Sequence, residues 1–208
     1  MNRSLLFLFL LLPLIAPAQF QKMSEAESAS FQKSVNATSE KIKTIASDFI
    51  QLKHLDFLDK EIETSGKMVF SEPSNLAWQY EKPYKYSIVF KNNKVYINDA
   101  GKKSSMDANA SKIFGKLNSL IVGSLSGKLF NDREFEIAFL KSRDRNLARL
   151  KPRDAELRKY LREIELYFDP VEHQVTEVRL VESAADYTRI IFKNKRINVA
   201  VPGAAFAH

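Results

Sequence analysis

The sequence predicts a mainly β (α+β) fold in which one antiparallel sheet curls into a barrel or half-barrel. Strand-like segments recur roughly every 8 to 12 residues over most of the chain, a spacing typical of an antiparallel meander. They amount to about ten or eleven strands, and a sheet of that width is seldom flat. The chain also contains 15 Phe, 7 Tyr and one Trp. Many of them alternate along these segments, which gives the sheet one apolar face.

A helix is predicted before the first strand. The sequence SEAE at 24–27 fits a capping box, in which a serine and a glutamate satisfy free amides at a helix start. Apolar residues at roughly helical spacing extend this helix to about Ala46. These residues are Phe31, Val35, Ile42 and Ile45.

Eleven segments have the composition of strands, and turn residues separate them. Asn92-Asn93 predicts a tight hairpin because Asn tolerates positive φ, and DKEIETSG at 59–66 is interpreted as a polar loop. The predicted strands are, in order, SDFIQLKHLDF, KMVF, NLAWQYE, YSIVF, KVYIND, EFEIAFL, LARLKP, EIELYFD, QVTEVRLVE, YTRIIFK and RINVAV.

Two helical segments interrupt the strands. Residues 153–163 predict a short helical turn, and residues 109–132 predict two short helices with a weak joint at Gly123 and Gly127, because glycine destabilises a helix interior. Such a jointed helix suits a movable lid better than a permanent plug. The apolar lid residues are Ile113, Phe114, Leu117, Leu120, Ile121, Leu125 and Leu129.

The N-terminus predicts export. Arg3 precedes an apolar run at 5–15, and Ala16-Pro17-Ala18 has the small-x-small pattern that signal peptidase recognises. We expect a signal peptide over residues 1–18, cleaved near Ala18, and a single domain over 19–208.

Composition limits the chemistry of the chain. A formal charge of +7 favours an anionic partner such as lipid headgroups or an acidic protein surface, and the basic segment 141–163 suits such docking as well as a solvated face. Export argues against nucleic acid. The chain has no cysteine and three scattered histidines, so it lacks disulfides and zinc-ligand spacing. We expect no enzymatic activity, no cofactor and no metal.

The apolar face supplies the candidate binding residues. Alternation along the strands lets them share one side of the sheet, where they fit either an ordinary core covered by helices or the lining of a cavity. The candidates are Phe49, Met68, Phe70, Trp78, Tyr80, Ile88, Phe90, Phe135, Ile137 and Phe139.

Residues 42–99 resemble the LolA-type outer-membrane lipoprotein carriers. In that family a Phe-x-Gln strand, a Ser-x-Gly pattern, a proline, a Trp-x-Tyr strand, a second proline and a short turn follow one another. The final DYTRIIFKNKRINVAVPGAAF is similar to the end of that family's domain. The matching residues are Phe49, Gln51, Ser65, Gly66, Pro73, Trp78, Tyr80, Pro83, Asn92 and Asn93.

The resemblance implies an incomplete, strongly curved half-barrel with a helical lid over an apolar cavity. Members take lipoproteins from an inner-membrane transporter, shield their acyl chains in the periplasm, and pass them to an outer-membrane acceptor. They carry a basic lid-latching residue where this chain has Glu72. A latch of reversed polarity would pair Glu72 with Lys116 or Lys128. Two alternatives stay open: a periplasmic shuttle for another lipid, such as a pigment or glycolipid, and an envelope-stress sensor-like module.

Overall fold

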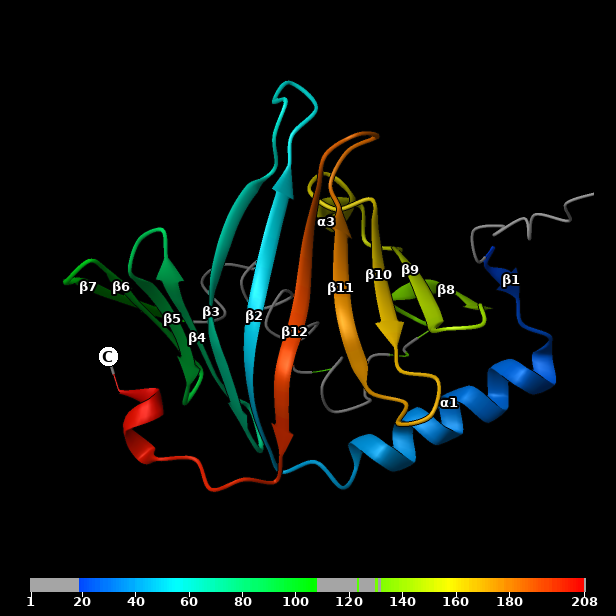
Figure 1. Cartoon of the computed structure of the whole chain (residues 1–208), viewed down its shortest axis with the longest axis horizontal. Helices are drawn as coiled ribbons and strands as arrows, with labels where there is room; N and C mark the ends of the chain where they lie inside the picture. Colours follow the sequence, from blue (N-terminus) through cyan, green and yellow to red (C-terminus); the bar gives the residue numbers. More distant parts are fainter. Residues whose placement is uncertain (1–18, 108–122, 124–129, 131, 208) are drawn as a thin grey trace, which may run out of the picture.

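The structure, a computed structural model, describes residues 19–107, 123, 130 and 132–207. The strands form one open antiparallel sheet of 12 strands in the order β1-β8-β9-β10-β11-β12-β2-β3-β4-β5-β6-β7. In Figure 1 the long strands β2 and β12 stand side by side in the middle of the sheet, and α1 runs along the lower edge. The mainly β prediction is confirmed.

The elements follow one another in this sequence: β1 Gln21–Lys22, α1 Glu25–Ser39, β2 Thr44–His54, β3 Ile62–Ser71, β4 Asn75–Lys82, β5 Tyr86–Lys91, β6 Lys94–Asp99, β7 Lys102–Asp107, β8 Phe135–Lys141, β9 Asn146–Pro152, α3 Ala155–Arg158, β10 Glu163–Phe168, β11 Val175–Val181, β12 Tyr187–Ile197 and the 3₁₀ helix η1 Gly203–Phe206.

The first helix begins as predicted but ends earlier. Ser24 and Glu27 form the capping box, whereas α1 stops at Ser39 and not near Ala46. Ile45 already lies in β2, paired with Phe70 of β3. The helix, the linker and the strand all turn apolar residues toward the same core, so the apolar spacing continues past the helix end.

The eleven predicted segments correspond to ten of the twelve strands, and several boundaries are wrong. The predicted loop 59–66 is wrong in its second half, because β3 begins at Ile62. The last two predicted segments form one strand, β12, with a bulge between Lys193 and Arg196. Strands β1 and β7 were not predicted: β1 has two residues, and β7 is mostly exposed at a sheet edge, so neither has an alternating apolar pattern.

Turn residues confirm the predicted hairpin, and two prolines lie at strand ends. Asn92 and Asn93 have φ values of 51° and 59° and join β5 to β6, as expected of a tight hairpin with both central residues in the left-handed region. Pro73 lies in the turn before β4 and Pro83 directly follows its last residue, where a missing amide does least harm to the sheet.

The two faces of the sheet differ in character. The inner face carries the main core, which includes Phe49, Met68 and Trp78 together with residues of α1 and β8–β12. The outer face carries a small apolar cluster, where Phe206 of η1 packs on Ala77 and Val89. Over β9–β12 the outer face carries ion pairs.

Candidate functional site

The structure brings all ten candidate binding residues onto the inner face. Seven of them are buried members of the main core, and Tyr80, Ile88 and Ile137 pack against it. The strand register explains this arrangement, since residues paired across neighbouring strands share a face. Met68 pairs with Trp78, and Trp78 pairs with Ile88. A role of these residues in lipid binding stays a prediction.

Glycine at position 66 allows the aromatic residues to meet across β3. Gly66 lies between Phe49 and Tyr80 in the register, and a Cβ there would stand 1.9 Å from the Gln79 carbonyl oxygen. Without that side chain, the Phe49 ring packs 4.5 Å from the Trp78 ring and 5.1 Å from the Tyr80 ring, centroid to centroid. Phe49, Trp78 and Tyr80 thus form a continuous aromatic surface.

The inner face also includes apolar residues that the sequence-based selection missed. A second aromatic group joins Phe31 of α1 to Phe139 and Phe168, with centroids 5.8 and 5.2 Å apart. Phe192 of β12 packs edge-on to Trp78. The alternation in EIELYFD and YTRIIFK carried the signal for Phe168 and Phe192, but only the sheet order shows that they face the same core.

A polar spot interrupts this apolar surface around Gln51. The Tyr80 hydroxyl donates to Gln51 Oε1 at 3.0 Å, and Thr64 pairs with Gln51 in the register. Burial raises the pKa of Tyr80, and the neighbouring Trp78 indole and Gln51 amide offset part of that rise. The indole Nε1–H lies near the hydroxyl, yet within the described part of the chain neither Trp78 Nε1 nor Thr64 Oγ1 makes an aligned hydrogen bond.

An ion pair lies farther along β2 from this spot. Lys53, two residues beyond Gln51 on β2, forms an ion pair with Glu182. The Thr188 hydroxyl donates to the other oxygen of Glu182 at 2.8 Å. Lys53 and Glu182 are both partly exposed, so the pair lies at the solvent end of the inner face.

The sequence profile of the family described as outer membrane lipoprotein carrier protein LolA matches residues 40–208. This chain belongs to the LolA family. A relative from Chromobacterium violaceum, described as an outer-membrane lipoprotein carrier protein, is 26% identical over 169 residues, which cover 79% of this chain and 76% of the relative.

Solved structures share the fold at low sequence identity. A chain of the Pseudomonas aeruginosa MucA/MucB complex has a TM-score of 0.50 at 9% identity, covering 87% of this chain and 61% of its own length. An uncharacterized conserved protein from Thermus thermophilus has a TM-score of 0.53 at 6% identity, covering 87% of this chain and 93% of its own. At these identities the likeness extends to the LolA-type fold alone.

The predicted lid and latch of this LolA-family chain are not settled by the geometry. Lid residues Ile113, Phe114, Leu117, Leu120, Ile121, Leu125 and Leu129 lie outside the described residues, as do Lys116 and Lys128. Glu72 is exposed in the turn between β3 and β4, and its backbone amide donates to the Lys43 carbonyl. The latch and the lid stay predictions from the sequence.

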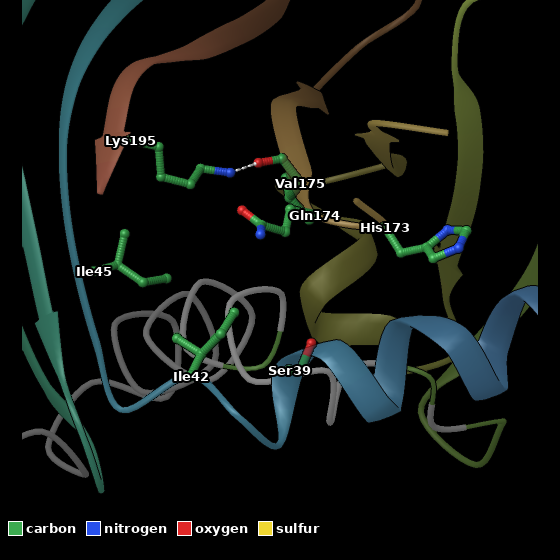
Figure 2. A pocket seen from close by; sticks show the side chains of 7 residues that line it. All are labelled: Ser39, Ile42, Ile45, His173, Gln174, Val175 and Lys195. Atoms are coloured by element: carbon green, nitrogen blue, oxygen red, sulfur yellow. Dashed lines mark hydrogen bonds between the residues drawn. The ribbon is translucent and has the colours of Figure 1, made fainter. Parts of the chain in front are cut away.

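A small pocket lies at the other end of the inner face (Figure 2). It holds about 10 Å³, roughly the space of one water molecule. Lys195 enters it from the β12 bulge and donates to the Val175 carbonyl, while Ile42 and Ile45 line the side next to α1. Burial lowers the pKa of Lys195 to about 8.

The outer face of β9–β12 carries paired charges. Glu177 accepts two hydrogen bonds from Arg189, at 2.7 and 3.0 Å. Glu165 accepts from the Tyr167 hydroxyl at 2.7 Å and from Arg149 at 3.2 Å. Part of the basic segment 141–163 is therefore engaged within the sheet.

No group of three or more His, Asp or Glu side chains is placed to hold a metal ion in the described part of the chain. No helix described here is long and apolar enough to cross a membrane.

Proposed function

We propose that this chain is a periplasmic carrier that shields the acyl chains of lipoproteins and moves them from the inner to the outer membrane. Membership of the LolA family supports binding of lipoprotein lipid. The observation that carries the proposal furthest is the inner face itself, where aromatic and aliphatic side chains from strands at both sides of the sheet form one cluster. On this proposal the chain needs no catalytic group.

The energetics of such a carrier are favourable. Each methylene kept from water contributes about 0.8 kcal/mol, so one long acyl chain needs shelter worth roughly 10 kcal/mol. Displacing side-chain contacts within the core offsets part of that gain, which allows release. The proposed partners are an inner-membrane lipoprotein-release transporter as donor and an outer-membrane acceptor.

Transfer of a triacylated lipoprotein from inner-membrane vesicles to the soluble chain tests the proposal. We expect transfer of the acylated protein and none of the same protein lacking its acyl chains. Ile88→Glu places a charge against the inner-face core and should reduce transfer at least tenfold. Ser87→Glu is the matched control, because Ser87 is the next residue of β5 and points to the opposite face. Equal transfer by both variants would contradict binding at the inner face.

Mass spectrometry of lipid co-purified from the native host tests the cargo. Recovery of acylated lipoproteins would support the proposal that the chain carries lipoproteins. Recovery of a free pigment or glycolipid would instead show a shuttle for that lipid.

A further inference from the structure

Two buried polar groups on the apolar inner face have no aligned hydrogen-bond partner among the described residues. Trp78 and Thr64 are each only 5% exposed, and neither Trp78 Nε1 nor Thr64 Oγ1 makes an aligned hydrogen bond within the described part of the chain. The polar neighbour of the indole Nε1–H is the Tyr80 hydroxyl, whose pKa the indole lowers. Buried polar groups are nearly always satisfied, because an unpaired one loses its hydration without compensation. Two such groups on one face therefore raise the question of which ligand atoms form hydrogen bonds with them.

Thr64 lies directly beside Gln51, whereas Trp78 is connected to Gln51 only through Tyr80. Thr64 is the register partner of Gln51 on β3, and the Trp78 indole is close to the Tyr80 hydroxyl that donates to Gln51 Oε1. Thr64 and Trp78 stand on neighbouring strands, with the row of Gly66 and Tyr80 between them. Because Gly66 has no side chain, nothing projects from β3 at that position between Thr64 and Trp78.

The chemistry of these groups selects the ligand. An indole N–H is only a donor, so it requires an acceptor, and the surrounding face requires that this acceptor be attached to apolar chains. A carboxylate or phosphate would need a cation, but Lys53 is already paired with Glu182. A neutral carbonyl oxygen meets all three conditions.

We propose that Trp78 Nε1–H and the Thr64 hydroxyl form a subsite for the ester or amide carbonyls that join acyl chains to their headgroup. The proposal rests on the proposed acyl-carrying function and refines it. The carbonyl oxygens accept from the two donors, while the acyl chains lie on the aromatic surface of Phe49, Trp78 and Tyr80. The site thereby fixes how far the acyl chains enter and distinguishes acylated lipids from hydrocarbon chains of other kinds.

The test compares two lipopeptides of equal chain length. One carries two ester-linked palmitoyl chains on a glyceryl group, and the other carries two hexadecyl chains in ether linkage, without carbonyls. Binding of each to delipidated protein is measured by titration. We expect the wild type to bind the ester about tenfold more tightly. The nearly isosteric Thr64→Val should lower the ester-to-ether ratio while keeping affinity for the ether. Trp78→Phe should also lower that ratio, but it trims the aromatic surface and should weaken both ligands.

The single tryptophan of the chain provides a direct readout. Its indole N–H gives one signal in a ¹H–¹⁵N spectrum, which should move downfield with the ester and less with the ether. Ile88→Val, which trims the apolar face without touching either donor, should weaken both ligands equally. Circular dichroism confirms the fold of each variant, and the ester-to-ether comparison in the wild type needs no variant at all.

The outcomes separate this subsite from the carrier function. Tight binding of both lipopeptides with a ratio near one and an unmoved indole signal would overturn the subsite and leave the carrier intact. Failure of both to bind would overturn the acyl-carrying function as well.

Discussion

The two faces of the sheet differ in how their buried polar side chains are hydrogen-bonded. On the outer face, Glu165 and Glu177 are almost fully buried, and each accepts hydrogen bonds from neighbouring side chains. On the inner face, Trp78 and Thr64 are equally buried and lack aligned partners among the described residues. Among the described residues, the two buried outer-face glutamates are thus satisfied within the sheet, whereas the two buried inner-face donors have no aligned acceptor.

The largest expected loss of stability comes from adding a side chain at Gly66, on the inner face. Gly66→Val places a Cβ against the Gln79 backbone, and strands β3 and β4 can relieve that clash only by separating. We expect a loss of at least about 3 kcal/mol in the free energy of unfolding, measured by urea denaturation. Gly203→Ala is the control, since a Cβ there meets nothing within 4 Å. Similar stability of the two variants would show that β3 and β4 can move apart freely.

Removing a carboxylate from the outer face should cause the second-largest loss in the free energy of unfolding. Glu177→Ala leaves Arg189 and Arg145 without their shared partner, and we expect a loss of about 2 kcal/mol. The two arginines are partly exposed and regain water, which keeps the loss below that of a fully buried pair. Glu136→Ala, an exposed position on β8, should change the stability by less than about 0.5 kcal/mol. Lipid affinity should stay unchanged in both, and a loss of affinity in Glu177→Ala would mean that the two faces are coupled.

Lys195 provides a charged group on the inner-face side for comparison. Burial lowers its pKa from 10.5 to about 8, so the folded protein disfavours the ammonium form. Lys195→Met should raise the free energy of unfolding at pH 7 by about 1 to 2 kcal/mol, net of the lost bond to Val175.

The sign of the pH dependence follows from the same shift. Between about pH 8 and 10.5 the folded chain has released this proton and the unfolded chain still holds it, so the wild type gains stability as the pH rises. This contribution is complete above 10.5 and is lost as the pH falls through 8. The difference between wild type and Lys195→Met, followed by thermal denaturation, should therefore shrink over that window. A constant difference would show that Lys195 is hydrated.

The smallest expected changes in stability come from removing one hydroxyl on each face, and they compare the two faces most directly. Tyr167→Phe removes an outer-face hydroxyl that donates to Glu165, and we expect a loss of about 1 kcal/mol. Thr64→Val removes an inner-face hydroxyl that has no hydrogen-bond partner among the described residues, so the lipid-free protein should lose nothing measurable. Equal losses in chemical denaturation would mean that the Thr64 hydroxyl is satisfied in solution and that the faces do not differ.

The sequence predicted the apolar face well because alternation is a local property. Trp78 and Tyr80 are two residues apart in one strand, so they share a face whatever their neighbours are. The polar spot around Gln51 was not predictable, because it depends on the register that sets Thr64 opposite Gln51 across two strands. The outer-face ion pairs depend on cross-strand register in the same way.

Local patterns also misled where different elements share one core. Ile42 and Ile45 continue the apolar spacing of α1 although the helix has ended, because the linker and β2 turn toward the same cluster. At the sheet edge the opposite occurs: β7 pairs regularly with β6, but its exposed residues need no apolar pattern. The spacing of apolar residues shows which residues are buried. It marks the bounds of a helix or strand only where the buried residues begin and end with that helix or strand.

The pairing of β2 with β12 has a consequence for how the chain folds. Strands β3–β7 continue the sheet from one side of this pair and β8–β11 with β1 from the other, so the central seam joins residues about 150 positions apart. At its lower end, the Asn198 side chain binds the Lys43 amide at 2.8 Å and the Lys41 carbonyl at 2.8 Å. Contacts of such long range form slowly. Each half can form hairpins while the polypeptide is still emerging, but the sheet becomes a single body only when its last strand arrives.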